Sequence, residues 1–247
     1  PPVALFSAQA ADSQQSTDVQ LQSDAGLLDT VYVSSAGRDE AAGDENNPVA
    51  TLAKALEMVR DGGAIKLAGA GNLSEQLTVG KNVTLDLNGK TLTSSKMIKA
   101  KADETSITLT IRDSGENGAI VGTSNPVVEA NKNGAVGLVS GTVKGSGTSV
   151  VRVQNSSGSF TMTGGAIQQT ANSTSKYTLM VNVGAAEITG GRLEGTGEAV
   201  TALYLTSGST AKLTIGVPVS GDQTQGQASA VYVQEIRLGK GTGLTLN

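Results

Sequence analysis

The sequence predicts an all-β protein: a single-stranded right-handed parallel β-helix with a capping helix at its N-terminal end. Of the 247 residues, 32 are Gly, 2 are Phe and none is Trp, while 38% are hydrophobic. A core with so few aromatic side chains must be thin and aliphatic, and stacked short strands provide such a core. The second observation is a repeat. A glycine followed two positions later by an aliphatic residue recurs at Gly118, Gly141, Gly165 and Gly191, at intervals of 23, 24 and 26 residues. This period is typical of one β-helix coil.

Residues 1–29 are predicted to form a flexible tether. Ala8-Gln9-Ala10 has the small-x-small form of a signal-peptidase site, and apolar residues precede it. The stretch that follows is rich in Gln, Ser, Asp and Ala, a composition that does not support a packed core. We therefore expect the remnant of a signal peptide and a tether. The alternative is a flexible tail with no role in targeting.

Residues 30–63 are predicted to form the cap: a strand at 31–33, an acidic loop rich in turn residues at 34–47, and a short helix. Thr51 is suited to the N-cap of this helix. The apolar positions share one face at helical spacing and are Leu52, Ala55, Leu56 and Val59. Gly62 is expected to end the helix in a left-handed conformation. A helix with one apolar stripe should lie across the open end of a stacked-strand core.

Residues 64–247 are predicted to form the coils. Each coil pairs its backbone with the coils above and below, at a spacing of roughly 4.8 Å. The strands that show the clearest alternation are 83–87, 108–111, 159–162 and 212–215. An antiparallel sandwich would instead show hairpin turns and no helix-capped repeat. The pattern favours the β-helix.

The cap residues resemble the N-terminal cap of the pectate-lyase-like right-handed β-helix superfamily. The segments that carry this resemblance are Tyr32-Val33-Ser34, Gly37-Arg38-Asp39, Gly43, Pro48, Thr51-Leu52, Ala55-Leu56 and the run from Asp61 to Leu67. Two later stretches, 85–92 and 162–167, look like the repeats of adhesin-like β-helix proteins on Gram-positive gut bacteria. The resemblance covers residues 30 to 247. It implies the fold and a bacterial cell-surface location, and it says little about activity because many functions share this scaffold.

Composition argues against several classes of function. The net charge is −4 and no run of Lys or Arg is present, so we expect no nucleic-acid partner. The chain has no Cys and no His, which removes thiol nucleophiles, the commonest general base and the commonest transition-metal ligand. No apolar stretch is long enough to cross a bilayer, so membrane insertion is not expected.

The sequence predicts no enzyme active site. By resemblance, lyase relatives use calcium held by several carboxylates with an Arg or Lys base, and hydrolase relatives use clustered Asp residues. Glycoside hydrolysis needs two carboxyl groups that face each other across the scissile bond. The acids of the repeat region fall at unrelated positions in successive coils and include Asp86, Asp113, Glu129, Glu187 and Glu194. A polysaccharide lyase or glycoside hydrolase is therefore the alternative function, and not the leading one.

One predicted column of side chains is a candidate binding surface. The segments 150–154, 179–181, 203–205 and 231–233 are interpreted as equivalent strands of successive coils. Alternation directs the residues between their aliphatic positions outward, which places Arg152, Met180, Tyr204 and Tyr232 in one column. Flat aromatic faces on an exposed sheet can bind sugars, since pyranose C–H faces pack on rings. The alternative is ordinary stacking of side chains along a sheet, which Tyr also favours.

The acidic loop is a candidate site for a structural calcium ion. Asp39, Glu40, Asp44 and Glu45 offer carboxylate oxygens, the ligands that calcium prefers, but they lack the spacing of an EF-hand. The alternative is a solvated acidic loop. We expect no other cofactor.

These observations lead to one functional hypothesis and two alternatives. The leading hypothesis is a non-catalytic, adhesin-like module, secreted or on the cell surface of a Gram-positive bacterium, that binds glycans or host or microbial surface proteins. A polysaccharide lyase or hydrolase, and a structural spacer with no ligand, are the alternatives. Because Leu244-Thr245-Leu246 resembles a coil strand with no cap after it, we expect the natural protein to continue beyond Asn247 as part of a longer surface protein.

Overall fold

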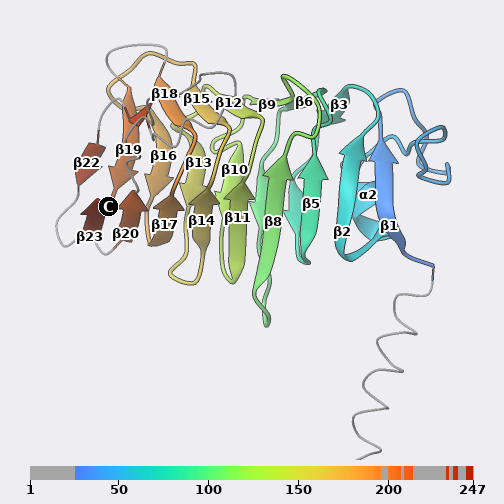
Figure 1. Ribbon diagram of the computed structural model, residues 1–247, viewed down its shortest axis with the longest axis horizontal. Coiled ribbons are helices and arrows are strands. Elements are labelled where there is room, and N and C mark those ends of the chain that lie inside the picture. The colour runs from blue at the N-terminus through green and yellow to red at the C-terminus, as the bar shows by residue number, and fades with distance from the viewer. Residues whose placement is uncertain are drawn as a thin grey trace, which may run out of the picture.

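The chain forms a right-handed parallel β-helix of three sheets, as the computed structural model shows in Figure 1. The structure describes residues 26–195, 200–206, 209–213, 232–233, 236–238 and 243–246. Successive strands of one coil belong to three different sheets, and each strand pairs with the equivalent strands of the neighbouring coils. This arrangement satisfies backbone hydrogen-bonding groups along the axis of the stack rather than within one coil.

The three sheets, here called A, B and C, contain only parallel pairings among the described strands. Sheet A consists of β1 (Leu28–Val33), β2 (Val59–Leu67), β5 (Val83–Asp86), β8 (Ile107–Arg112), β11 (Gly134–Leu138), β14 (Ser159–Met162), β17 (Gly184–Ile188), β20 (Ser209–Leu213) and β23 (Gly243–Leu246). Sheet B consists of β3 (Gly71–Leu73), β6 (Thr91–Ser94), β9 (Ala119–Gly122), β12 (Thr142–Gly145), β15 (Ala166–Gln169), β18 (Arg192–Gly195) and β21 (Tyr232–Val233). Sheet C consists of β4 (Leu77–Val79), β7 (Ile98–Ala100), β10 (Val128–Ala130), β13 (Ser149–Val153), β16 (Tyr177–Val181), β19 (Thr201–Leu205) and β22 (Ile236–Leu238).

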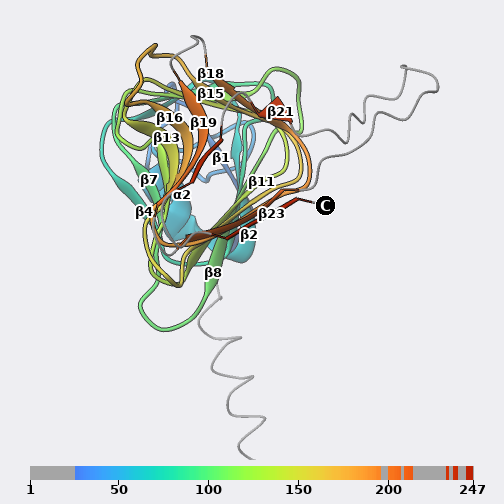
Figure 2. The ribbon, with the colours of Figure 1, turned by 90° about the vertical axis from the view of Figure 1, so that its left-hand side faces the viewer.

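The core consists of aliphatic side chains that stack in columns inside the coils. One column of sheet B illustrates the pattern, since Ile120, Val143 and Ile167 pair in register and are each at most 1% exposed. Phe160 is the one aromatic residue among the buried hydrophobic side chains of the described residues. The view along the stack in Figure 2 shows the strands of successive coils superposed around this core. The expectation of a thin aliphatic core is confirmed.

The glycine repeat marks the corner between sheet A and sheet B. Thr142 pairs with Ala119 and Ala166, and Ala166 pairs with Arg192, so the glycines directly before these residues stack on one another. At Gly141, Gly165 and Gly191 φ is +82°, +74° and +94°, a left-handed conformation that residues with a Cβ atom rarely adopt. The predicted repeat is therefore confirmed, and the turn geometry explains why glycine recurs in it.

The cap differs from the prediction at the end of its helix. The helix α2 runs from Leu52 to Met58, and the side chain of Thr51 caps it by accepting a hydrogen bond from the backbone N–H of Lys54 at 3.1 Å. The chain becomes extended at Val59 and enters β2 directly. Gly62 does have a positive φ of +74°, but it lies inside β2, where it does not cap the helix.

The helix closes one end of the coil stack, as Figure 2 shows. Its buried residues are Leu52 and Ala55, which belong to the same cluster as the core of the coils. The loop after β1 returns to that strand, where Val49 forms a parallel β-bridge with Val33.

Two predicted boundaries need adjustment, since β1 begins at Leu28 and β2 continues across residue 63. Residues 1–25, with the predicted signal-peptide site, lie outside the described residues.

Among the described residues, α2 has 7 residues, and no helix is long and apolar enough to cross a membrane.

Candidate functional site

The outward face of sheet C carries the predicted column, with one correction. Glu129, Arg152, Met180 and Tyr204 pair in register on β10, β13, β16 and β19. Lys99 on β7 extends the column on the other side of Glu129. The predicted membership of Arg152, Met180 and Tyr204 in one column is thus confirmed. Their binding of a ligand stays a prediction.

Tyr232 does not belong to this column. It lies on β21 of sheet B, where its backbone pairs with Arg192. The residue that pairs with Tyr204 on sheet C is Arg237 of β22. In the last coil, β20 ends at Leu213 and β21 begins only at Tyr232, a much longer interval than between β17 and β18. The alternation around Tyr232 resembles that of the sheet C strands, which is why the residue was assigned to them. Because the stretch of chain before β21 is longer, Tyr232 lies on sheet B instead.

A buried carboxylate organises the first half of the column. The side chain of Glu129 is 2% exposed, although it points to the outer face of the sheet. Arg152 donates two hydrogen bonds to its Oε2, from Nη2 at 2.6 Å and from Nε at 3.1 Å. Asn131 donates to Oε1 at 2.7 Å, and Lys99 Nζ lies 3.5 Å from the same oxygen.

These partners determine the protonation state of Glu129. Burial acts to raise the pKa of the Glu129 carboxyl, but the hydrogen bonds from Arg152 and Asn131 and the positive charges of Arg152 and Lys99 outweigh it. The net result is a pKa below its usual value. Glu129 is therefore a carboxylate at neutral pH, already supplied with donors, and is poorly suited to act as a general acid.

In the second half of the column, the ring of Tyr204 stacks on that of Tyr177, which lies on β16 outside the column. The ring centroids of Tyr177 and Tyr204 lie 4.5 Å apart with an interplanar angle of 15°. Sequence alternation did not place Tyr177 outward, because it lies two positions before the buried Leu179. The alternation fails at Thr178, which is also buried, so that Tyr177 remains half-buried and reaches Tyr204. The stack covers one face of each ring.

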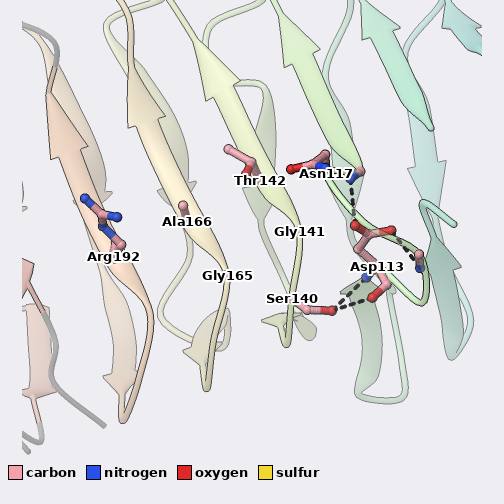
Figure 3. A pocket seen from close by; sticks show the side chains of 10 residues that line it. Asp113, Asn117, Ser140, Gly141, Thr142, Gly165, Ala166 and Arg192 are labelled. Carbon is pink, nitrogen blue, oxygen red and sulfur yellow. Dashed lines mark hydrogen bonds between the residues drawn. The ribbon is translucent and has the colours of Figure 1, made fainter. Parts of the chain in front are cut away.

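A second surface feature, which the sequence did not predict, lies at the corner between sheets A and B. It is an open pocket of about 410 Å³, shown in Figure 3. Glycines form much of its wall, and the side chains of Asn117, Thr142, Ala166 and Arg192 lie along it. In Figure 3 these four residues come from successive coils, with Ala166 between Thr142 and Arg192. The small side chain of Ala166 leaves the hollow between its two neighbours.

The loop at one end of this pocket is fixed by Asp113. Its carboxylate accepts hydrogen bonds from the backbone N–H groups of Gly89 at 2.6 Å, Gly118 at 2.6 Å and Gly115 at 3.2 Å. The hydroxyl of Ser140, in the next coil, accepts a hydrogen bond from the backbone N–H of Asp113 at 2.8 Å and donates one to its backbone carbonyl at 3.0 Å. Asp113 thus joins three coils, and its oxygens are used in the architecture of the turn.

The acidic loop does not gather its carboxylates. Asp39 accepts hydrogen bonds from the backbone N–H groups of Ala50 and Thr51 at 3.0 and 2.9 Å, which fixes the start of α2. Asp44 accepts from the backbone of residues 46 and 47, which holds its pKa below the usual value. In the part of the chain that the structure describes, no three acidic, His or Cys residues are grouped so as to hold a metal ion. The structure therefore does not bring Asp39, Glu40, Asp44 and Glu45 together, and calcium binding there stays a prediction.

The acids of the coils are distributed over all three sheets and one corner. Asp86 ends a sheet A strand, Glu187 lies on sheet A, Glu194 on sheet B and Glu129 on sheet C. Asp86 is fully buried and is bound by Arg112, with Nη2 at 2.9 Å. Burial works to raise the pKa of Asp86, but hydrogen bonds from Ser114 and Asn88 and the charge of Arg112 lower it overall. These acids lie apart and do not converge on one site among the described residues.

The fold and these two surfaces define a parallel β-helix repeat protein with a stacked pair of tyrosines on one sheet face and a pocket at one corner. No family model, no curated protein and no solved structure matches the chain.

Proposed function

We propose that the chain is a non-catalytic, adhesin-like binding module, secreted or on a bacterial cell surface, that binds glycans through the outward face of sheet C. The observation that supports this most is the stacked pair of Tyr177 and Tyr204, which are both half-buried. Tyr204 follows Arg152 and Met180 in one column. The location rests on the resemblance of the cap and repeats to adhesin-like members of the pectate-lyase-like superfamily.

The geometry of the stack limits how a sugar can bind. Since each ring covers one face of the other, a pyranose can pack only on an outer ring face or against the ring edges. Met180 lies beside Tyr204 in the register and adds an apolar, adaptable contact. The tyrosine hydroxyls and the guanidinium of Arg152 can then bind sugar hydroxyls. An apolar surface with a few polar groups around it is the usual composition of a ligand site.

The β-helix supplies rigidity to this surface. Tyr204 and Met180 are held by neighbouring strands whose inward residues, Leu203 and Leu179, are fully buried. A ligand surface with little freedom to lose has a smaller entropic cost on binding. This favours a display function for the rod, and a spacer would not require the stacked tyrosines.

Binding without catalysis is favoured by the state of the carboxylates. Glu129, the one acid in the column, is an ionised group enclosed by its partners. A hydrolase would need a second carboxyl group facing it. The acid that lines the corner pocket is Asp113, and its oxygens already accept three backbone hydrogen bonds, which disfavours a catalytic role for it.

A glycan array tests the proposal with the wild type, Tyr204→Ala and Tyr177→Ala. We expect wild-type binding to fall about five- to tenfold in both variants, since about 1–1.5 kcal/mol of aromatic contact is lost in each. Tyr32→Ala is the matched control, because Tyr32 is also half-buried but lies on β1 in another sheet. Equal binding by all four proteins would exclude this face. Turnover of pectin, alginate or host glycans in a reducing-sugar assay would replace the proposal with an enzymatic function.

A further inference from the structure

We propose that the corner pocket between sheets A and B is a second binding site, and that its ligand is a neutral sugar of one or two pyranose rings. The pocket lies on different sheets from the tyrosine column, so the inference does not rest on the function proposed for sheet C. Its volume of about 410 Å³ is within the range of small-ligand sites.

The register of sheet B gives the pocket the length of a sugar. Thr142, Ala166 and Arg192 occupy equivalent positions on three successive strands. Neighbouring strands are about 4.8 Å apart, so the two outer residues are separated by about 10 Å along the rod. A methyl side chain stands between them. The pocket is therefore deepest at Ala166, and the space between Thr142 and Arg192 has the length of one or two pyranose rings.

The polar groups along the pocket suit hydroxyl groups, which both donate and accept hydrogen bonds. Asn117 is exposed at one end and has a φ of +64°, in a turn that Asp113 fixes through the N–H of the next residue, Gly118. The Thr142 hydroxyl lies between Asn117 and Ala166 along the pocket. Arg192 lies at the other end, with its side chain 64% exposed.

An ion pair fixes the position of the cation at that end. Arg192 pairs with Glu194, which lies two residues further along the same strand. Glu194 is held from the other side by Gln168, whose Nε2 donates to it at 2.7 Å. The guanidinium of Arg192, held in this position, can donate hydrogen bonds to sugar hydroxyls in the pocket.

The charges disfavour an acidic ligand. Among the residues that line the pocket, all of them described, Arg192 is the one cation, and Glu194 already neutralises it. Asp113 contributes a negative charge to the opposite end. A uronate or a phosphate would have to displace Glu194 from Arg192 while it approached a second carboxylate, whereas a neutral sugar would not.

The blocking variant is Ala166→Tyr. Ala166 points outward, so the larger side chain fills the hollow without entering the core, and Tyr is well tolerated in strands. Thr161→Tyr is the matched control, because it makes an exposed tyrosine on the sheet A strand of the same coil. Thr142→Val removes one hydroxyl while it keeps the shape of the side chain. Circular dichroism and melting temperature establish that each variant is folded.

Saturation-transfer NMR and titration would use methyl glycosides of glucose, galactose, mannose and N-acetylglucosamine, with cellobiose, galacturonate and inorganic phosphate as further probes. We expect at least one neutral probe to bind with a Kd of about 0.1–10 mM, equivalent to about 3–5 kcal/mol. Ala166→Tyr should weaken this binding at least about tenfold and Thr142→Val about threefold. Thr161→Tyr and Tyr204→Ala should leave it unchanged.

Three outcomes would overturn the inference. They are the absence of saturation by any neutral probe, undiminished binding by a folded Ala166→Tyr variant, and tighter binding of galacturonate or phosphate than of every neutral sugar. The result for Tyr204→Ala separates this site from the proposed function, because loss of binding in that variant would locate the sugar on sheet C.

Discussion

Replacement of Arg152 by methionine should destabilise the protein by about 2–3 kcal/mol. The guanidinium donates two hydrogen bonds to Glu129, whose side chain is 2% exposed. Loss of one partner from a buried ion pair costs about 3–5 kcal/mol, since the remaining charge stays buried. The cost here is reduced because Lys99 still lies 3.5 Å from the carboxylate. Water can also enter the space of Arg152, whose side chain is 24% exposed.

The double variant Glu129→Gln with Arg152→Met separates the buried charge from the loss of packing. The amide introduced by Glu129→Gln would keep an oxygen that can accept from Asn131, and no carboxylate would remain unpaired. We expect the double variant to be within about 1 kcal/mol of the wild type and therefore more stable than Arg152→Met alone. Urea unfolding followed by far-UV circular dichroism measures all three proteins. The reasoning fails if Arg152→Met costs less than about 0.5 kcal/mol, or if the second substitution restores nothing.

Three further predictions concern the core, a turn and pH. Phe160→Ala should cost about 3–5 kcal/mol in urea unfolding, because it empties the core of its one described aromatic side chain. Gly134→Ala should cost about 3 kcal/mol, since its Cβ would lie 2.0 Å from a backbone oxygen of the preceding coil, whereas Gly80→Ala, with 3.6 Å to the nearest atom, should cost nothing measurable. Folding lowers the pKa values of Asp86 and Glu129 from their usual 3.8 and 4.5. The two carboxylates therefore contribute fully to the free energy of unfolding above the usual values, and this contribution is lost as the pH falls through the lowered folded-state values. Acid titration of the unfolding free energy should show this decline, and Glu129→Gln should make it shallower.

The coils could be predicted because their signals are local and repeated. Each turn at Gly141, Gly165 and Gly191 requires a left-handed residue, and each following strand places an aliphatic side chain inward two positions later. These constraints recur at a nearly constant interval. The sequence therefore indicated the sheet A strands at 83–87, 108–111 and 159–162, the aliphatic core and the outward direction of Arg152, Met180 and Tyr204.

Features that depend on a break in this regularity could not be predicted in the same way. Tyr232 was assigned to the wrong sheet because the last coil is longer before β21. Tyr177 was missed because two consecutive residues, Thr178 and Leu179, are both buried at the start of its strand. The helix was expected to continue to Gly62, but burial of Val59 against the first strand draws the chain into β2. The corner pocket results from the small side chain of Ala166 between the larger ones of Thr142 and Arg192 on neighbouring coils. These residues are 24 and 26 positions from Ala166 in the sequence, so no local pattern shows that they are neighbours.

In-register pairing also gives this architecture an unusual tolerance to changes in length. Ser159 occupies the position of Ala135 one coil later, so a segment from Ala135 to Gly158 is one complete layer. Removal or duplication of such a layer would shorten or lengthen the rod by about 4.8 Å and would bring equivalent strand positions into contact again. A gene that gains or loses whole layers can thus alter the reach of the molecule, and the distance between surfaces on different layers, without inventing a new core.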